Sequence, residues 1–155
     1  MHACAQFSFA QVGVNGLTCS QCLRSTEMAL MKLDFVEKVE MELEKTEGKV
    51  FFKLDKKVEM DKVAQAVEDA GFSVRFLKAE FDFSTIKWEG DNCFRFENAW
   101  YQLQNFDKEK AYSGKHLLTF VGKNFQELKA WKAMQEPLQT NCGKKNDKLF
   151  SVLVE

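Results

Sequence analysis

The order of hydrophobic patterns in the first half of the chain is the feature that most constrains its fold. Residues 20–33 and 61–70 have the apolar spacing of amphipathic helices. Four further segments have the β-former content or the alternation of strands, namely 7–14, 36–44, 50–54 and 72–77. The expected order is strand–helix–strand–strand–helix–strand. Over residues 6–81 this predicts a ferredoxin-like βαββαβ domain.

Segment 36–44 has the clearest strand pattern. Its apolar residues alternate with glutamates, as in a half-buried antiparallel strand. The residues concerned are Val39, Met41 and Leu43 on one face, and Glu40, Glu42 and Glu44 on the other. Together with Glu37, the glutamates are expected to be a solvated face, and docking of a basic partner is the alternative.

Residues 82–155 are expected to form a second, small β-rich domain with one helix, which makes the whole chain α+β. The predicted strands are 84–89, 94–106, 116–121 and 149–154. The predicted helix is 125–134, with Asn124 and Glu127 placed as a capping box. An OB-like barrel is one arrangement for this half, although only one strand follows the helix where that fold normally has two.

Composition excludes several classes of protein. Hydrophobic residues make up 45% of the chain and charged residues 29%, as in folded globular domains. The formal net charge of −1 argues against binding to nucleic acid or to an anionic membrane surface. No apolar run is long enough to predict a transmembrane segment. With two histidines and no common catalytic motif, the chain is not expected to be an enzyme.

Residues 1–5 are expected to be a tail without an apolar signal-peptide core. The string Ala3-Cys4-Ala5 resembles the end of a bacterial signal peptide, and an ordinary frayed terminus is the other interpretation. The first interpretation places the protein in the bacterial periplasm or cell envelope, with Cys4 lipid-anchored or removed. We favour that compartment slightly over the cytoplasm.

One motif carries chemistry. Residues 16–22 read Gly-Leu-Thr-Cys-Ser-Gln-Cys and join the first strand to the first helix. Cys19 therefore falls in a loop and Cys22 in the opening turn of a helix, where backbone amides and the helix dipole favour a thiolate. Thiolates are the metal-binding form of cysteine, and this spacing lets both sulfurs converge on one soft ion.

This region resembles the heavy-metal-associated domain of copper chaperones, of metal-pumping ATPases and of periplasmic mercury carriers. The family motif is Gly-Met-Thr-Cys-x-x-Cys, which this chain matches except for Leu17 in place of methionine. The resemblance continues through segments 27–30, 36–39 and 66–72, and it covers about residues 7–78.

The resemblance implies that Cys19 and Cys22 bind the metal, with Cu(I) as the first choice of ion and Zn(II) or Hg(II) as alternatives. Leu17 would be the buried anchor of the loop, and Thr18 would hydrogen-bond within it. Phe72 would lie near the site, where other members have phenylalanine, tyrosine or lysine. The implied function is a metal carrier or sensor. Its partner would be a metal-donor or metal-acceptor protein, and a metal-transporting ATPase is one example.

Two other functions stay open. Cys19 and Cys22 could be a redox dithiol, although thioredoxin-like proteins typically have Trp-Cys-Gly-Pro-Cys where this chain has Thr-Cys-Ser-Gln-Cys. A structural disulfide between them is a further competitor. Alternatively, the chain could be an interaction module in which the β-rich half is the functional part.

The remaining candidate residues are expected to be structural. Cys93 and Cys142 are interpreted as buried apolar residues, free thiols or a disulfide pair, rather than as metal ligands. Neither His2 nor His116 is expected to bind metal. Core positions are expected for the large side chains Met28, Met31, Met41, Trp88, Trp100, Tyr101 and Trp131, with a ligand groove as the alternative for the aromatic ones.

Overall fold

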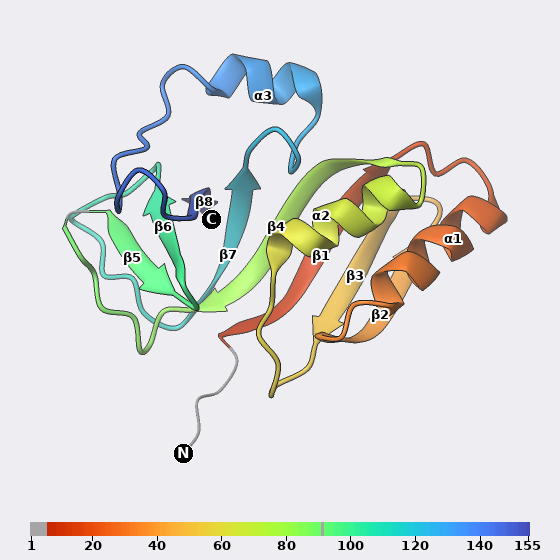
Figure 1. The fold of residues 1–155 in the computed structure, drawn as a ribbon, viewed down its shortest axis with the longest axis horizontal. Helices are drawn as coiled ribbons and strands as arrows, with labels where there is room; N and C mark the ends of the chain where they lie inside the picture. The colour runs from red at the N-terminus through yellow and green to blue at the C-terminus, as the bar shows by residue number, and fades with distance from the viewer. Residues whose placement is uncertain (1–5, 91) are drawn as a thin grey trace.

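The computed structural model describes residues 6–90 and 92–155 (Figure 1). The first half contains β1 (Phe7–Asn15), α1 (Ser20–Met31), β2 (Val36–Glu42), β3 (Glu47–Phe52), α2 (Met60–Asp69) and β4 (Ser73–Asp82). The second half contains β5 (Cys93–Phe96), β6 (Ala99–Leu103), β7 (Lys115–Val121), α3 (Leu128–Met134) and β8 (Leu149–Val154). Residues 1–5, with His2 and Cys4, lie outside the described residues, and so does residue 91.

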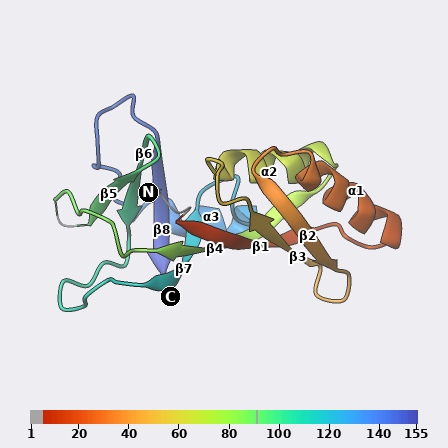
Figure 2. The ribbon, with the colours of Figure 1, turned by 90° about the horizontal axis from the view of Figure 1, so that it is seen from below.

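The strands of the described residues form one sheet in the order β2-β3-β1-β4-β7-β8-β6-β5. The first four strands have the ferredoxin-like order, and α1 and α2 both lie on the same face of that part of the sheet (Figure 2). The expected ferredoxin-like fold of the N-terminal region is therefore confirmed. No helix among the described residues is long and apolar enough to cross a membrane.

The OB-like arrangement of the second half is not confirmed. Its strands extend the sheet of the first half, because β7 pairs antiparallel with β4, with Lys78 opposite Thr119 and Phe81 opposite His116. β8 then pairs antiparallel with β7 and parallel with β6. The result is one open mixed sheet, with α1 and α2 on one face and α3 in a connection between β7 and β8, rather than a separate barrel.

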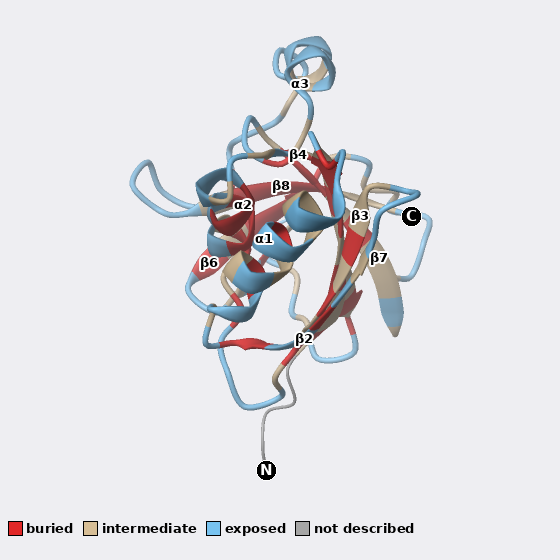
Figure 3. Cartoon of the chain, turned by 90° about the vertical axis from the view of Figure 1, so that its right-hand side faces the viewer, coloured by how far each residue is buried: buried red, intermediate tan, exposed pale blue. Residues whose placement is uncertain are grey.

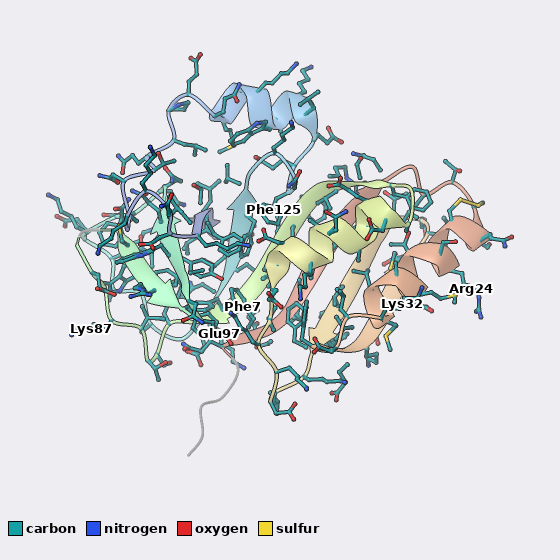
Figure 4. All side chains as sticks on the ribbon, viewed as in Figure 1. Phe7, Arg24, Lys32, Lys87, Glu97 and Phe125 are labelled. Atoms are coloured by element: carbon teal, nitrogen blue, oxygen red, sulfur yellow. A yellow bond between two sulfur atoms is a disulfide. The ribbon has the colours of Figure 1, made fainter. Side chains whose placement is uncertain are left out.

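Aromatic side chains pack across the junction of the two halves. Phe7 lies where β1 and β4 meet the second half (Figure 4), with its ring centroid 4.8 Å from that of Phe81. From the second half, Tyr101 and Phe120 approach Phe7 to 6.1 and 6.2 Å between centroids. All four are buried, and burial of such a side chain contributes about 1.5–3 kcal/mol. The two halves therefore share one hydrophobic core, whose buried residues run along the sheet and the inner faces of α1 and α2 (Figure 3).

Three predictions about the second half were wrong in detail. The predicted strand 84–89 is instead a turn at residues 84–85 followed by irregular chain with one isolated bridge, from Trp88 to Phe94. Asp82 Oδ1 accepts hydrogen bonds from the Ser84 amide and hydroxyl, which turn the chain after β4. The predicted strand 94–106 is a hairpin, because Glu97 and Asn98 adopt positive φ angles of 50° and 66°.

The third error concerns the predicted helix 125–134, which begins only at Leu128. Phe125 is instead buried against Phe120, at 5.4 Å between ring centroids. Glu127 is the N-cap residue and makes no capping side-chain hydrogen bond. Packing of Phe125 into the core thus displaced the predicted capping box.

Apolar residues of the first half are also less buried than expected. Met28 and Met31 are 51% and 45% exposed, because α1 turns Thr26 and Leu30 toward the sheet instead. Leu43 lies beyond the end of β2, in the turn that follows, and is exposed. The glutamates of β2 are exposed, as expected.

Candidate metal centre

The loop between β1 and α1 is anchored to the core by one side chain. Gly16 turns the chain with a φ angle of +96°, a conformation that favours glycine. Leu17 follows and is only 4% exposed, packed with the core residues of the first half. Thr18 is exposed. A buried residue next to a constrained turn fixes where the following cysteines lie.

Cys19 and Cys22 lie together at the start of α1. Cys19 is the N-cap residue, with φ −149° and ψ 160°, and its carbonyl accepts a hydrogen bond from the Leu23 amide at 3.1 Å. The Cα atoms of the two cysteines are 5.2 Å apart, and their sulfurs are joined in a disulfide. Cys19 is exposed and Cys22 is half-buried. The structure thus shows the oxidised form of the pair.

The surroundings favour negative charge on these sulfurs once they are reduced. The backbone amide of Cys22 donates to Cys19 Sγ at 3.1 Å, and the first turn of α1 holds no acidic residue. Helix N-termini stabilise anions, so a thiolate is favoured over a thiol there. The buried Thr26 hydroxyl donates to the Cys22 carbonyl at 3.1 Å and ties this turn to the core side of the helix.

The described residues bring no third metal-binding side chain to this pair. Within residues 6–90 and 92–155, no three His, Cys, Asp or Glu side chains are grouped so that they could hold a metal ion. Among the described residues, the ligands for a metal at this position would be the two sulfurs of Cys19 and Cys22, together with any ligand that a partner supplies.

Phe72, between α2 and β4, lies beside the loop that joins β1 to α1. Gly71 ends α2 with a φ angle of +98°, and the Phe72 amide then donates to the Val67 carbonyl at 3.1 Å. This turn brings the Phe72 ring against Gly16, where a Cβ atom would lie 2.9 Å from Cδ1 of the ring. The aromatic ring therefore packs against the loop that carries the cysteines.

Arg75 supports the same end of the sheet and was not predicted. Its guanidinium donates to the Val14 carbonyl at 3.2 Å, to the Thr46 hydroxyl at 2.9 Å and to the Lys45 carbonyl at 3.2 Å. These hydrogen bonds connect the end of β1 to the turn between β2 and β3. An arginine in a strand has no distinctive sequence signal, and only the tertiary contacts identify this role.

The other cysteines and the histidine among the described residues make their contacts in the second half. Cys93 and Cys142 form a disulfide with 5.9 Å between Cα atoms, which was one of the three interpretations left open. The His116 ring nitrogen Nε2 contacts the Ser113 carbonyl at 2.9 Å, and the ring packs beside Phe83. His2 and Cys4 lie outside the described residues.

The aromatic candidates do not form one groove. Trp88 packs against Phe83, Phe94 and Phe106, while Trp100 donates to Asp147 Oδ2 at 3.1 Å. Tyr101 is buried in the shared core. Their roles are structural packing of the second half.

Comparison with known proteins identifies a family over the first half. The family model described as "Heavy-metal-associated domain" matches residues 11–73. The copper chaperone CopZ of Staphylococcus saprophyticus is 38% identical over 64 residues, which cover 41% of this chain and 93% of CopZ.

Two further relatives match over a smaller share of their own length. The copper-transporting ATPase RAN1 of Arabidopsis thaliana is 38% identical over 76 residues, which cover 49% of this chain but only 8% of the ATPase. The periplasmic component of the mercuric transport protein of Pseudomonas fluorescens is 39% identical over 61 residues, covering 39% of this chain and 66% of that protein.

Proposed function

Through residues 11–73 the chain belongs to the heavy-metal-associated domain family, and on that premise we propose that it binds one soft metal ion and passes it to a partner protein. The observation that carries this proposal is the pair Cys19 and Cys22. Two sulfurs converge at an exposed helix start that favours thiolates. Thr18 and Leu17 lead into the pair, and Phe72 packs beside the loop.

Cu(I) is the ion that fits this donor set best. Soft thiolates prefer soft ions, and two of them suffice for Cu(I) or Hg(II), whereas structural Zn(II) sites use four ligands. The names of the relatives point the same way, since one is a copper chaperone, one a copper-transporting ATPase and one a mercuric transport protein. Hg(II) is the second choice, and Zn(II) is the third.

Transfer follows from exposure of the site. The Cys19 side is open to solvent, so a cysteine of the partner can approach the ion, bind it, and displace one sulfur at a time. The ion changes ligands without any covalent bond of the protein being made or broken, so the chain acts as a carrier and not as an enzyme. A metal-transporting ATPase is one partner of suitable chemistry, as the match to RAN1 suggests.

We place the protein in the bacterial cell envelope. The Cys93–Cys142 disulfide supports this location, because such bonds persist in oxidising compartments and are rare in the cytosol. The second half would then serve docking or localisation, with residues 6–81 as the metal-binding part.

A redox function for the same cysteines is the second candidate, since the structure holds Cys19 and Cys22 as a disulfide. Turnover of a disulfide substrate distinguishes the two, because a carrier should show none beyond the rate of a free dithiol. An oxidoreductase would also lose its dithiol turnover in the Cys22→Ser variant, because Cys19 alone can form only a mixed disulfide with the substrate.

A Cu(I) competition titration against a chromophoric chelator tests the proposed function. The reduced chain is expected to withdraw one ion per chain from the chelator without oxygen, and the Cys19→Ser/Cys22→Ser variant should withdraw none. The matched control is Cys93→Ser/Cys142→Ser, which removes the same number of sulfurs elsewhere and should retain the affinity. Equal, poor competition by all three proteins would reject the metal-carrier function.

A further inference from the structure

The described residues contain two disulfides in very different surroundings. One, Cys19–Cys22, lies at the exposed start of α1 and encloses only two residues. The other, Cys93–Cys142, joins β5 to a segment 49 residues away in sequence. Segment 135–148, here called the C-terminal loop, contains no helix or strand.

The two bonds differ in access. Reduction by thiol exchange needs a thiolate to reach one sulfur of the disulfide in line. Cys19 is exposed, so the first disulfide offers an open sulfur. Cys142 is only 5% exposed and Cys93 is half-buried, so the second disulfide is shielded.

They also differ in what reduction leaves behind. A reduced Cys19–Cys22 pair is stabilised by the Cys22 amide and the helix N-terminus, which favour thiolates. Stabilising the reduced form makes a disulfide easier to reduce.

Among the described residues, Cys93 begins strand β5 and Cys142 lies in the C-terminal loop, so neither cysteine stands at the start of a helix. The two cysteines belong to segments that many other bonds hold in place, so the thiols would stay close together and re-form the disulfide readily.

A network of side-chain amides holds the C-terminal loop against the sheet. Gln102 is fully buried, and its Nε2 donates to Asn141 Oδ1 at 2.6 Å, next to Cys142. Gln104 exchanges two hydrogen bonds with the backbone of Gln139, at 2.8 and 2.9 Å. Asn92, next to Cys93, donates to Gln139 Oε1 at 3.2 Å. These contacts hold the segment of Cys142 against that of Cys93 in addition to the disulfide.

We propose that the chain contains a permanent cross-link and a separate, reducible dithiol: Cys93–Cys142 stays oxidised under conditions that reduce Cys19–Cys22. In the reducing step a dithiol reagent attacks one sulfur of Cys19–Cys22. That bond breaks, two electrons and two protons pass to the cysteines, and the reagent becomes a cyclic disulfide. The consequence of this reduction for metal binding rests on the proposed function, because only the reduced Cys19–Cys22 pair provides thiolate ligands.

Because the two disulfides are reduced at different stages, the redox state of Cys19 and Cys22 controls whether the site can bind the ion. In an oxidising compartment the oxidised pair cannot take the ion, and a dithiol reductant must open it first. The fold survives this step because the cross-link that stabilises the second half is left intact.

The test uses the full oxidised chain without metal, in redox buffers with graded ratios of reduced to oxidised dithiothreitol. After equilibration the free thiols are alkylated and assigned by peptide mass mapping. Cys19 and Cys22 should be half-alkylated at a ratio at least about tenfold lower than Cys93 and Cys142. Parallel alkylation of the two pairs, or earlier alkylation of Cys93 and Cys142, would overturn the proposal.

The Asn141→Ala variant tests the role of the amide network in this result. Asn141→Ala removes the bond from Gln102, so it should lower the ratio that half-reduces Cys93–Cys142 by about twofold to tenfold and leave that of Cys19–Cys22 unchanged. An equal shift of both pairs would contradict the role of the amide network. If reduction is staged but the reduced chain takes up no Cu(I), the redox proposal stands and the proposed metal function fails.

Discussion

The ring of Phe72 packs so closely on Gly16 that a Cβ atom there would lie 2.9 Å from Cδ1 of the ring. Gly16 also has a φ angle of +96°. Two constraints thus act on one residue, three positions before Cys19. Through this contact the end of α2 determines the path of the loop that carries the cysteines.

Replacement of Gly16 by alanine should therefore disturb both stability and the site. The positive φ angle alone costs a residue with a Cβ atom about 1–2 kcal/mol, and the Phe72 ring must move in addition. We expect a lower free energy of unfolding in urea and an apparent Cu(I) affinity weakened by about tenfold.

Gly71→Ala is the matched control for this substitution. Gly71 has a similar φ angle of +98°, but nothing lies within 4 Å of a Cβ atom there. The Gly71→Ala variant should lose about the same 1–2 kcal/mol of stability to backbone strain and should keep the metal affinity. Equal affinities in the two variants would show that the Phe72 contact does not position the cysteines.

A fragment ending at residue 81 should be less stable than the full chain. It would expose Phe7 and Phe81, which Tyr101 and Phe120 cover in the structure, at about 1.5–3 kcal/mol for each side chain. It would also leave β4 as an edge strand, paired with β1 but no longer with β7. Urea unfolding followed by circular dichroism measures the difference, and a fragment as stable as the full chain would indicate two independent domains.

Removal of the Cys93–Cys142 bond should destabilise the protein without changing the metal site. A cross-link over 49 residues contributes about 2–4 kcal/mol, largely by restricting the unfolded chain. The Cys93→Ser/Cys142→Ser variant should unfold at lower urea concentration and be cleaved faster by protease in segment 135–148. Unchanged stability would mean that the amide network alone holds the segment.

Asp147 should titrate below the ordinary range of aspartate. Hydrogen bonds from the Lys144 amide and from Trp100 Nε1 to its carboxylate lower the pKa of Asp147. A lowered folded-state pKa contributes stability above the unfolded-state pKa, and that contribution is lost as the pH falls through the folded-state value. Carboxyl NMR titration should show a low pKa that rises in Trp100→Phe, and an ordinary value in both proteins would refute the account.

Much of the first half could be predicted because its local signals agree with its tertiary packing. The alternation before Glu42 predicts β2, and Gly71 marks the end of α2. Residues 16–22 predict a strand–loop–helix path, and the structure places Cys19 at the N-cap of α1. Most patterns in this region point to the same fold, although Met28, Met31 and Leu43 are more exposed than their spacing predicts.

The second half was harder to predict because tertiary contacts override its local signals. Phe125 leaves the predicted helix to pack on Phe120, and Glu97 takes a positive φ angle without the usual Asn-Gly signal. Pairing of β7 with β4 and the bond between Cys93 and Cys142 join segments distant in sequence. A single sequence has no local feature that encodes such pairings.

X-ray absorption spectroscopy at the copper edge of the reduced, Cu(I)-loaded chain tests the central claim most directly. Binding by Cys19 and Cys22 predicts a Cu(I) ion with two sulfur neighbours and no nitrogen or oxygen ligand from this chain. The spectrum should be identical for the Cys93→Ser/Cys142→Ser variant. A shell of nitrogen or oxygen ligands, or the same spectrum from Cys19→Ser/Cys22→Ser, would contradict the claim.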